Sequence, residues 1–267
     1  MSGPGAVRMT VRLGLGIEPA DAVRGGRIGH TLVAAVDGVP HPPTRLQADP
    51  DLPPWVKQDV LERIPRTHAC RYRLLLRPGL GPGPVPVRMW DDSRRYVPRR
   101  LEVAMLNVAL DPPAPWGRII RPALFPGAAY GVPAGSVGCR GRVLRGGVPM
   151  RWARVEARVG GVVVGRAHGD DRGEFLLLLG PAAATGPDLV FPIQAKVTVY
   201  GPDPPPPPGP EAALDPLWDL PLEVVPATGG AGILAGTKVP PGYRATADPR
   251  VVGFGPDGLR GETFVFT

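Results

Sequence analysis

The amino-acid sequence predicts an all-β fold, and three observations lead to this prediction. Apolar and polar residues alternate with a period of two in many short stretches, which is typical of half-buried strands. The 37 Gly and 38 Pro residues cluster between these stretches, where they favour turns. Only one stretch, residues 53–64, has its apolar residues close to helical spacing. The order of these elements predicts an N-terminal antiparallel β domain with one short helix, then a β-sandwich and an extended C-terminal arm.

Residues 1–110 are expected to form the N-terminal β domain. In the first alternating stretch Val7, Met9 and Val11 lie on one face, while Arg8 and Thr10 lie on the other. The short helix in "PPWVKQDVLERI" should end at the proline that follows it. The strands expected in this domain are "AVRMTVRLGL" (6–15), "HTLVAAVDG" (30–38), "ACRYRLLLRPG" (69–79), "VPVRMWDD" (85–92) and "RRLEVAMLNV" (99–108).

The second half of the chain repeats the pattern after a predicted linker, residues 111–117, whose consecutive prolines cannot join a β-ladder. Strands separated by Gly-rich turns predict a β-sandwich over residues 118–200. A Pro-rich loop follows at 201–213, and residues 214–267 are expected to add C-terminal strands or an arm. The strands expected in the sandwich are "GCRGRVLRGG" (138–147), "MRWARVEARVGG" (150–161), "GEFLLLLG" (173–180) and "IQAKVTVYG" (193–201).

Composition limits the classes of protein to which this chain can belong. The net charge is +7, but Arg far outnumbers Lys throughout, so the charge reflects a biased composition as much as an acidic partner. Cys70 and Cys139 are too few for a disulfide framework and are expected to be buried free thiols. The chain shows neither a signal-like leader nor an apolar run long enough to span a bilayer. We therefore expect a soluble cytoplasmic protein that has no membrane contact.

The stretch "RAHGDDRGEFLLLL" (166–179) can be interpreted as a metal loop, as half of an acid/base pair, or as a turn that feeds a strand. Too few acidic residues are present at alternating positions for a calcium loop. The turn is favoured because Asp170 or Asp171 can accept backbone N–H groups, Gly173 can adopt a positive φ, and Phe175 can open the strand that enters the core.

This stretch, together with "RGRVLRGGVPMRWARVEA", resembles the carboxypeptidase regulatory-like module, which is a transthyretin-like β-sandwich. The matching positions are Gly141 and Val143, Pro149, Ala153 and Val155, then Asp170, Gly173 and Phe175. The resemblance covers about sixty residues and implies a fold. It implies no particular function, because such modules serve as structural attachments in many proteins.

A second resemblance covers more of the chain. The segments "RRYVPRRL", "LFPGAAYGVPAGSVGCRGRV", "WARVEA", "GRAHGDDRGEFLLLL" and "GTKVPPGY" look like those of a protein encoded with phage-tail-like contractile injection particles. This resemblance implies a non-enzymatic structural component in a terminal cap or baseplate complex. The expected partners are sheath, tube or terminal-complex proteins, and the chain is expected to form a homo-oligomeric ring. The alternative is a free cytoplasmic adaptor that recognises a carbohydrate or a peptide.

No catalytic residue, cofactor or metal is expected. The histidines His30, His41, His68 and His168 do not pair at the spacing of metal ligands. Ser136 lies in "AGSVG", near the pattern of a nucleophile elbow, but a strand rather than a helix is predicted after it.

The basic stretch "RRYVPRR" is the candidate protein interface, together with Trp152, which the alternation places outward beside two arginines. Arginine and aromatic side chains favour subunit interfaces. The same residues can suit nucleic acid, although nucleic acid is not the expected partner, and they can also be a solvated strand edge in an Arg-rich chain. The residues of this candidate interface are Arg94, Arg95, Tyr96, Arg99, Arg100 and Trp152.

Overall fold

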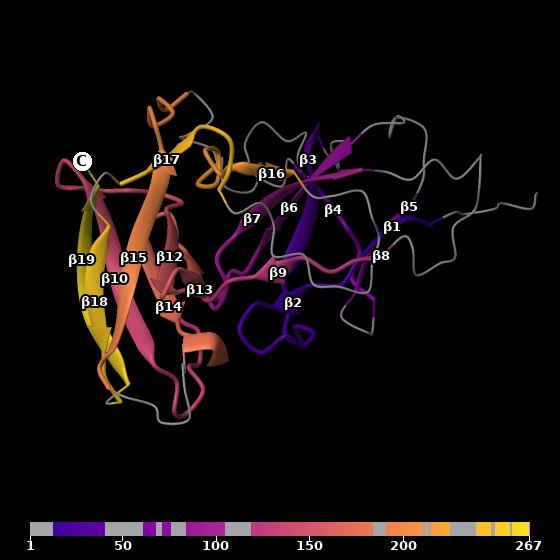
Figure 1. Cartoon of the computed structure of the whole chain (residues 1–267). Coiled ribbons are helices and arrows are strands. Elements are labelled where there is room, and N and C mark those ends of the chain that lie inside the picture. Colours follow the sequence, from indigo (N-terminus) through magenta and orange to yellow (C-terminus); the bar gives the residue numbers. More distant parts are fainter. Residues whose placement is uncertain are drawn as a thin grey trace, which may run out of the picture.

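The all-β prediction is confirmed. In the part of the chain that the structure describes, the regular elements are strands, apart from 3-10 turns such as η2 (Pro181–Ala183). The strands form two groups that lie side by side in Figure 1: the N-terminal unit, with β1–β9 and β16, and the sandwich unit, with β10–β15 and β17–β19. The structure is a computed structural model that describes residues 13–40, 61–67, 71–75, 84–104, 119–183, 191–209, 212, 215–224, 239–246, 249–256 and 258–266.

A five-stranded sheet in the order β16-β7-β6-β3-β4 forms one layer of the N-terminal unit. Adjacent strands of this sheet run antiparallel, except that β16 runs parallel to β7. The strands are β3 (Val33–Pro40), β4 (Leu61–Arg63), β6 (Pro84–Trp90), β7 (Arg99–Ala104) and β16 (Leu222–Val224).

The predicted helix over residues 53–64 is wrong at its C-terminal end, where Leu61–Arg63 form β4 and pair with β3. The helical spacing of this stretch rests on only a few apolar residues, so pairing with the available edge of β3 decides the conformation of its C-terminal end. Residues 53–60 lie outside the described part of the chain.

The other strands of the N-terminal unit come from both sides of the predicted linker, which itself lies outside the described residues. The strand β1 is antiparallel to β5 and parallel to β8, and β2 is parallel to β9. Both β8 and β9 fall in the range 118–200 that was predicted as sandwich, so the N-terminal unit extends further than expected. The strands are β1 (Leu13–Ile17), β2 (Ala20–Asp21), β5 (Tyr72–Leu75), β8 (Ile119–Ile120) and β9 (Ala123–Leu124).

Two sheets face each other in the sandwich unit. In the first sheet β10 (Gly138–Arg145) pairs with β11 (Val148–Pro149) and β14 (Glu174–Leu178) along one edge, and with β19 (Leu259–Phe266) along the other. In the second sheet β15 lies between β12 and the two strands β17 and β18, and β13 lies outside β12. Its strands are β12 (Arg154–Val159), β13 (Val162–His168), β15 (Ile193–Pro202), β17 (Tyr243–Ala245) and β18 (Arg250–Phe254).

The strand β14 belongs to two hydrophobic cores at once. Phe175 and Leu177 face the sandwich core, whereas Leu176 and Leu178 pack in the core of the N-terminal unit. A strand that is buried on both faces needs apolar residues at every position. This requirement explains the unbroken apolar run of "GEFLLLLG".

The described C-terminal residues do not form the expected extended arm, because the strands β16 to β19 all pair with other strands of the chain. In particular, β19 runs parallel to β10 over its whole length, and β18 pairs with β15. Phe264 and Phe266 fill the sandwich core. The described C-terminal strands are therefore integral parts of both units.

The segment 215–224 crosses from the sandwich unit back to the N-terminal unit, and we call it the clasp. Asp215 pairs with Arg88, and Asp219 accepts hydrogen bonds from Arg151 at 2.7 Å and from the indole of Trp152 at 2.7 Å. The clasp ends in β16 beside β7. It therefore ties the two units together through charged groups as well as through the β-ladder.

Other expectations concern the Pro-rich loop, the cysteines and the membrane. Gly201 and Pro202 still belong to β15, and the prolines 204–208 are exposed.

Cys139 is a buried free thiol, and burial raises its pKa to about 12. Cys70 lies outside the described residues. Among the described residues, no helix is long and apolar enough to cross a bilayer.

Candidate functional site

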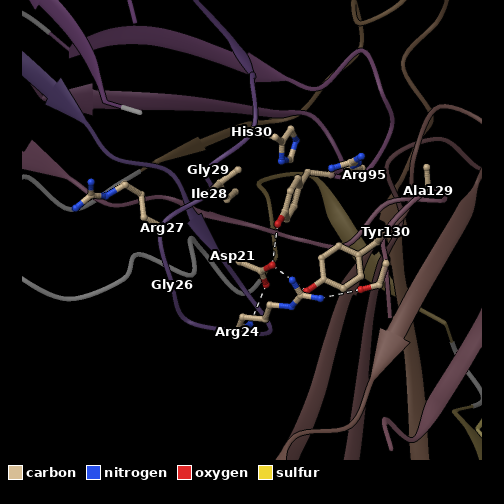
Figure 2. Close-up of a pocket in the computed structure, with 12 residues that line it drawn as sticks. Asp21, Arg24, Gly26, Arg27, Ile28, Gly29, His30, Arg95, Ala129 and Tyr130 are labelled. Atoms are coloured by element: carbon tan, nitrogen blue, oxygen red, sulfur yellow. Dashed lines mark hydrogen bonds between the residues drawn. The ribbon is translucent and has the colours of Figure 1, made fainter. Parts of the chain in front are cut away.

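The candidate site is a cleft of about 550 Å³ in the N-terminal unit. Three loops form its walls: the Asp21 loop (21–30), the Asp91 loop (91–96) and the Tyr130 loop (126–131). Figure 2 shows their side chains around the opening. The lining residues are Asp21, Arg24, Gly26, Arg27, Ile28, Gly29, His30, Arg95, Tyr96, Ala129, Tyr130 and Gly131.

Asp21 joins the three loops. One carboxylate oxygen accepts the backbone N–H groups of Val23 at 2.8 Å and Arg24 at 2.9 Å, which closes an Asx turn. The other accepts the hydroxyls of Tyr96 at 2.7 Å and Tyr130 at 2.8 Å. Burial and the adjacent Asp21 carboxylate raise the pKa of both tyrosines, so both keep their protons and remain donors to Asp21.

Asp91 fixes the second loop in the same way. One carboxylate oxygen accepts hydrogen bonds from the backbone N–H of Ser93 at 3.0 Å and from the Ser93 hydroxyl at 2.6 Å. The other oxygen accepts the backbone N–H groups of Arg95 at 2.9 Å and Tyr96 at 3.2 Å. His30 Nε2 lies 3.0 Å from the second oxygen. Burial alone would raise the pKa of Asp91, but the hydrogen bonds from Ser93 and His30 lower it below its ordinary value.

The Tyr130 loop lies directly against the Asp91 loop. Gly127 donates its N–H to the carbonyl of Arg95 at 2.7 Å. A Cβ atom at Gly127 would lie 2.5 Å from the carbonyl oxygen of Arg94, so this close approach requires glycine. From β10, Arg140 donates to the carbonyl of Ala128 at 2.7 Å and holds the loop from behind. The walls of the cleft are thus fixed before any ligand enters.

The cleft has a positive lining. Arg24 donates to the carbonyl of Gly131 at 3.0 Å and lies 5.5 Å from the centre of the Tyr130 ring. Arg95, on the Asp91 loop, also lines the cleft (Figure 2). Neither arginine has a carboxylate partner among the described residues. The arrangement can bind an anion, because guanidinium groups suit carboxylates and phosphates.

The predicted interface "RRYVPRR" does not form one surface. Tyr96 is buried and donates to Asp21. Arg100 pairs with Asp37, and Arg94 pairs with Asp171 of the sandwich unit at 3.1 Å. Of the residues named here, only Arg94 and Arg95 are exposed, and only Arg95 combines exposure with the absence of a carboxylate partner in the described part of the chain.

Arg99 is fully buried, so its prediction as an interface residue is wrong. Its Nε and Nη2 atoms donate to the Glu223 carboxylate at 3.1 and 2.6 Å, and Arg154 donates to the same carboxylate at 3.1 Å. Burial alone would raise the pKa of Glu223, but the two arginines hold it below its ordinary value. This ion cluster joins β7, β12 and β16 because a buried Arg in an apolar interior must find a charged partner.

Trp152 also differs from its prediction, since it is only 2 % exposed. The predicted alternation runs from 150 to 161, but β12 begins at Arg154 and Trp152 lies in a turn with a φ of 57°. A turn breaks the period of two, so the assignment of faces does not carry across it. The indole packs under Leu220 of the clasp, and it cannot serve as a platform for a carbohydrate or a peptide.

The residues of the predicted turn lie as follows. Asp170 Oδ1 accepts the backbone N–H groups of Arg172 and Glu174, each at 2.9 Å. Gly173 has a φ of 71°, and Phe175 is buried in the sandwich core. The paired aspartates thus have separate roles: Asp170 closes the turn and Asp171 binds Arg94. Among the described residues there is no group of three His, Cys, Asp or Glu residues that could hold a metal ion.

No protein-family model, curated protein or solved structure matches this chain.

Sequence reasoning missed most of the cleft, since it selected only Arg95 and Tyr96 of the lining. A local signal was available in "DAVRGG" at Asp21 and in "DDS" at Asp91, where an aspartate precedes residues that favour turns. No local signal brings Tyr130 beside Asp21, because β9 places it there by pairing with β2.

Proposed function

We propose that this chain is a non-enzymatic structural component of a phage-tail-like contractile particle, located in a terminal cap or baseplate complex. Its partners would be other copies of the chain together with sheath, tube or terminal-complex proteins, and it would be made in the cytoplasm. The proposal rests on the segments that resemble such a protein. The observation that supports it best is that β14 and the clasp join two β units into one body.

A subunit of a terminal ring must keep its shape while the particle assembles and contracts. Domains connected only by a linker move relative to one another unless their interface is extensive. Here β14 contributes to both cores, and the buried cluster of Arg99, Arg154 and Glu223 connects the units a second time. This construction favours a rigid building block.

The residues that resemble the regulatory-like module lie together in the sandwich unit. Gly141 on β10 illustrates why the pattern needs its glycine, since a Cβ atom there would lie 2.3 Å from the ring of Phe175. Phe175 can fill the core only because Gly141 leaves this space. The packing thus supports the proposal of a regulatory-like module.

The test is co-sedimentation. Particles are pelleted from a native lysate, purified on a density gradient and analysed by mass spectrometry. We expect this chain to sediment with sheath and tube proteins at a low and fixed stoichiometry. Recovery of the chain only as a free species, from a lysate in which intact particles are present, would overturn the proposal.

A further inference from the structure

Arg24 and Arg95 differ from most arginines of the described chain in their ion pairing. Arg27, at the rim of the cleft, pairs with Glu18 at 3.5 Å, and Arg94 pairs with Asp171. Most other described arginines likewise have a carboxylate within 4 Å. Arg24 and Arg95 belong to the smaller group for which no carboxylate partner is found among the described residues, and both line the same cleft. Like charges that share a concave site repel each other, and an anion bound between them relieves the repulsion.

The carboxylates in the walls cannot supply this anion. The oxygens of Asp21 already accept two backbone N–H groups and two hydroxyls, and the residue is 3 % exposed. Asp91 is equally buried and accepts hydrogen bonds from its own loop. Each carboxylate is therefore already occupied by donors that hold the loops in place.

Arg24 is already in position to bind a ligand. The hydrogen bond to Gly131 uses one of its five N–H groups, and its guanidinium carbon lies 5.5 Å from the centre of the Tyr130 ring. The backbone of Arg95 is fixed by its N–H bond to Asp91 and by the bond that its carbonyl accepts from Gly127. Binding therefore has to order the side chain of Arg95 but neither its backbone nor the Arg24 guanidinium, which favours affinity.

We propose that this cleft is an oxyanion-binding site, in which the guanidinium groups of Arg24 and Arg95 bind a carboxylate or a phosphate. The volume of about 550 Å³ is in the range of small-ligand sites. The ligand is therefore a small organic anion or the acidic end of a peptide segment. This inference concerns the isolated chain and does not depend on the proposed assembly.

The experiment is isothermal titration calorimetry on the full chain at low salt with three probes: citrate, inorganic phosphate and an acetylated tetraglutamate peptide. We expect saturable binding of at least one probe at one site per chain, weakened by added NaCl. Arg95→Gln and Arg24→Gln should each weaken it about tenfold or more, because each removes a charge-assisted contact. Tighter binding of citrate or phosphate identifies a small anion, whereas tighter binding of the peptide identifies an acidic partner segment.

The matched control is Arg244→Gln, which removes an exposed arginine of β17 in the sandwich unit. It should leave the affinity unchanged. Arg95 is exposed, so Arg95→Gln should fold normally, which circular dichroism verifies. Absence of saturable binding for all three probes would overturn the site. Equal weakening by Arg95→Gln and Arg244→Gln would overturn it too, because it would show general attraction to a basic protein.

Discussion

Asp21 has more structural partners than its position in a turn suggests, because one buried carboxylate accepts donors from all three cleft loops. In Asp21→Asn an N–H₂ group would replace one acceptor and face either the tyrosine hydroxyls or the backbone N–H groups. We expect the free energy of unfolding to fall by about 2–4 kcal/mol, measured by urea denaturation. The control Asp92→Asn changes an exposed aspartate and should have little effect. Equal urea denaturation midpoints for Asp21→Asn and Asp92→Asn would contradict the role of Asp21 in joining the three loops.

His168 predicts a loss of stability in mild acid. Burial, reinforced by Arg154 and Arg99, holds its pKa well below the ordinary value, and its ring stacks on Phe125 at 3.8 Å. The folded state keeps His168 neutral while the unfolded chain binds a proton below about pH 6.5. The stabilising contribution is therefore complete above that pH and is lost as the pH falls, by about 1.4 kcal/mol per pH unit.

The measurement is the free energy of unfolding between about pH 7 and pH 5, a window in which carboxylates with ordinary or lowered pKa values stay largely ionised. His168→Gln removes the titrating group and should flatten the dependence. The same slope in the variant as in the parent chain would show that another group is responsible.

Because β14 contributes to two cores, we expect truncation of either of two adjacent leucines on this strand to lower the free energy of unfolding. Leu176→Ala leaves a cavity in the N-terminal core and Leu177→Ala leaves one in the sandwich core. Each should lower the free energy of unfolding by about 2–5 kcal/mol, although the side chains point in opposite directions. An ordinary half-exposed strand would show one large and one small effect. Val265→Ala, at a position that is 62 % exposed, is the control and should change stability by less than about 0.5 kcal/mol.

From the burial of Glu223 in the clasp we expect this residue to contribute more to the free energy of unfolding than a residue of an exposed ion pair does. Glu223→Gln would leave Arg99 and Arg154 buried without a carboxylate, at a cost of about 3–5 kcal/mol measured by denaturation. Asp203→Asn breaks an exposed pair with Arg244 and should cost about 0–1 kcal/mol. Similar small losses for both variants would mean that the cluster does not hold the clasp.

Strands with regular alternation could be predicted from the sequence, and elements whose partners are distant could not. The turn at Asp170 and the apolar run after it depend on neighbouring residues, so local chemistry suffices. The burial of Arg99 depends on Glu223, which lies 124 positions away. The clasp and the cleft likewise come from long-range pairing, for which an alternation pattern contains no information.

At the scale of the whole molecule, shared elements predict that both units unfold together. Neither core is complete without β14, and the clasp contributes β16 to the N-terminal sheet. We expect one thermal transition in which the calorimetric and van't Hoff enthalpies agree. Two resolved transitions would show that the units are independent domains, and they would also remove the main support for the proposed rigid building block.

The buried position of Arg99 also decides which variants can test assembly. Reversing the charge of Arg99 and Arg100 together would place a carboxylate beside Glu223 in the interior, so loss from particles would report misfolding. Arg95 is exposed and has no described ion pair, so a charge reversal there leaves the interior unchanged. An assembly experiment should therefore use Arg95, with folding verified in the same sample.

The parallel pairing of β19 with β10 has a consequence for synthesis on the ribosome. The ribosome makes β10 long before β19, and at ordinary translation rates the delay is on the order of ten seconds. During that time one edge of β10 is open and the sandwich lacks Phe264 and Phe266. Nascent chains would therefore expose an unpaired, aggregation-prone strand edge that chaperones can recognise. Neighbouring ribosomes on one messenger RNA would bring several such edges close together.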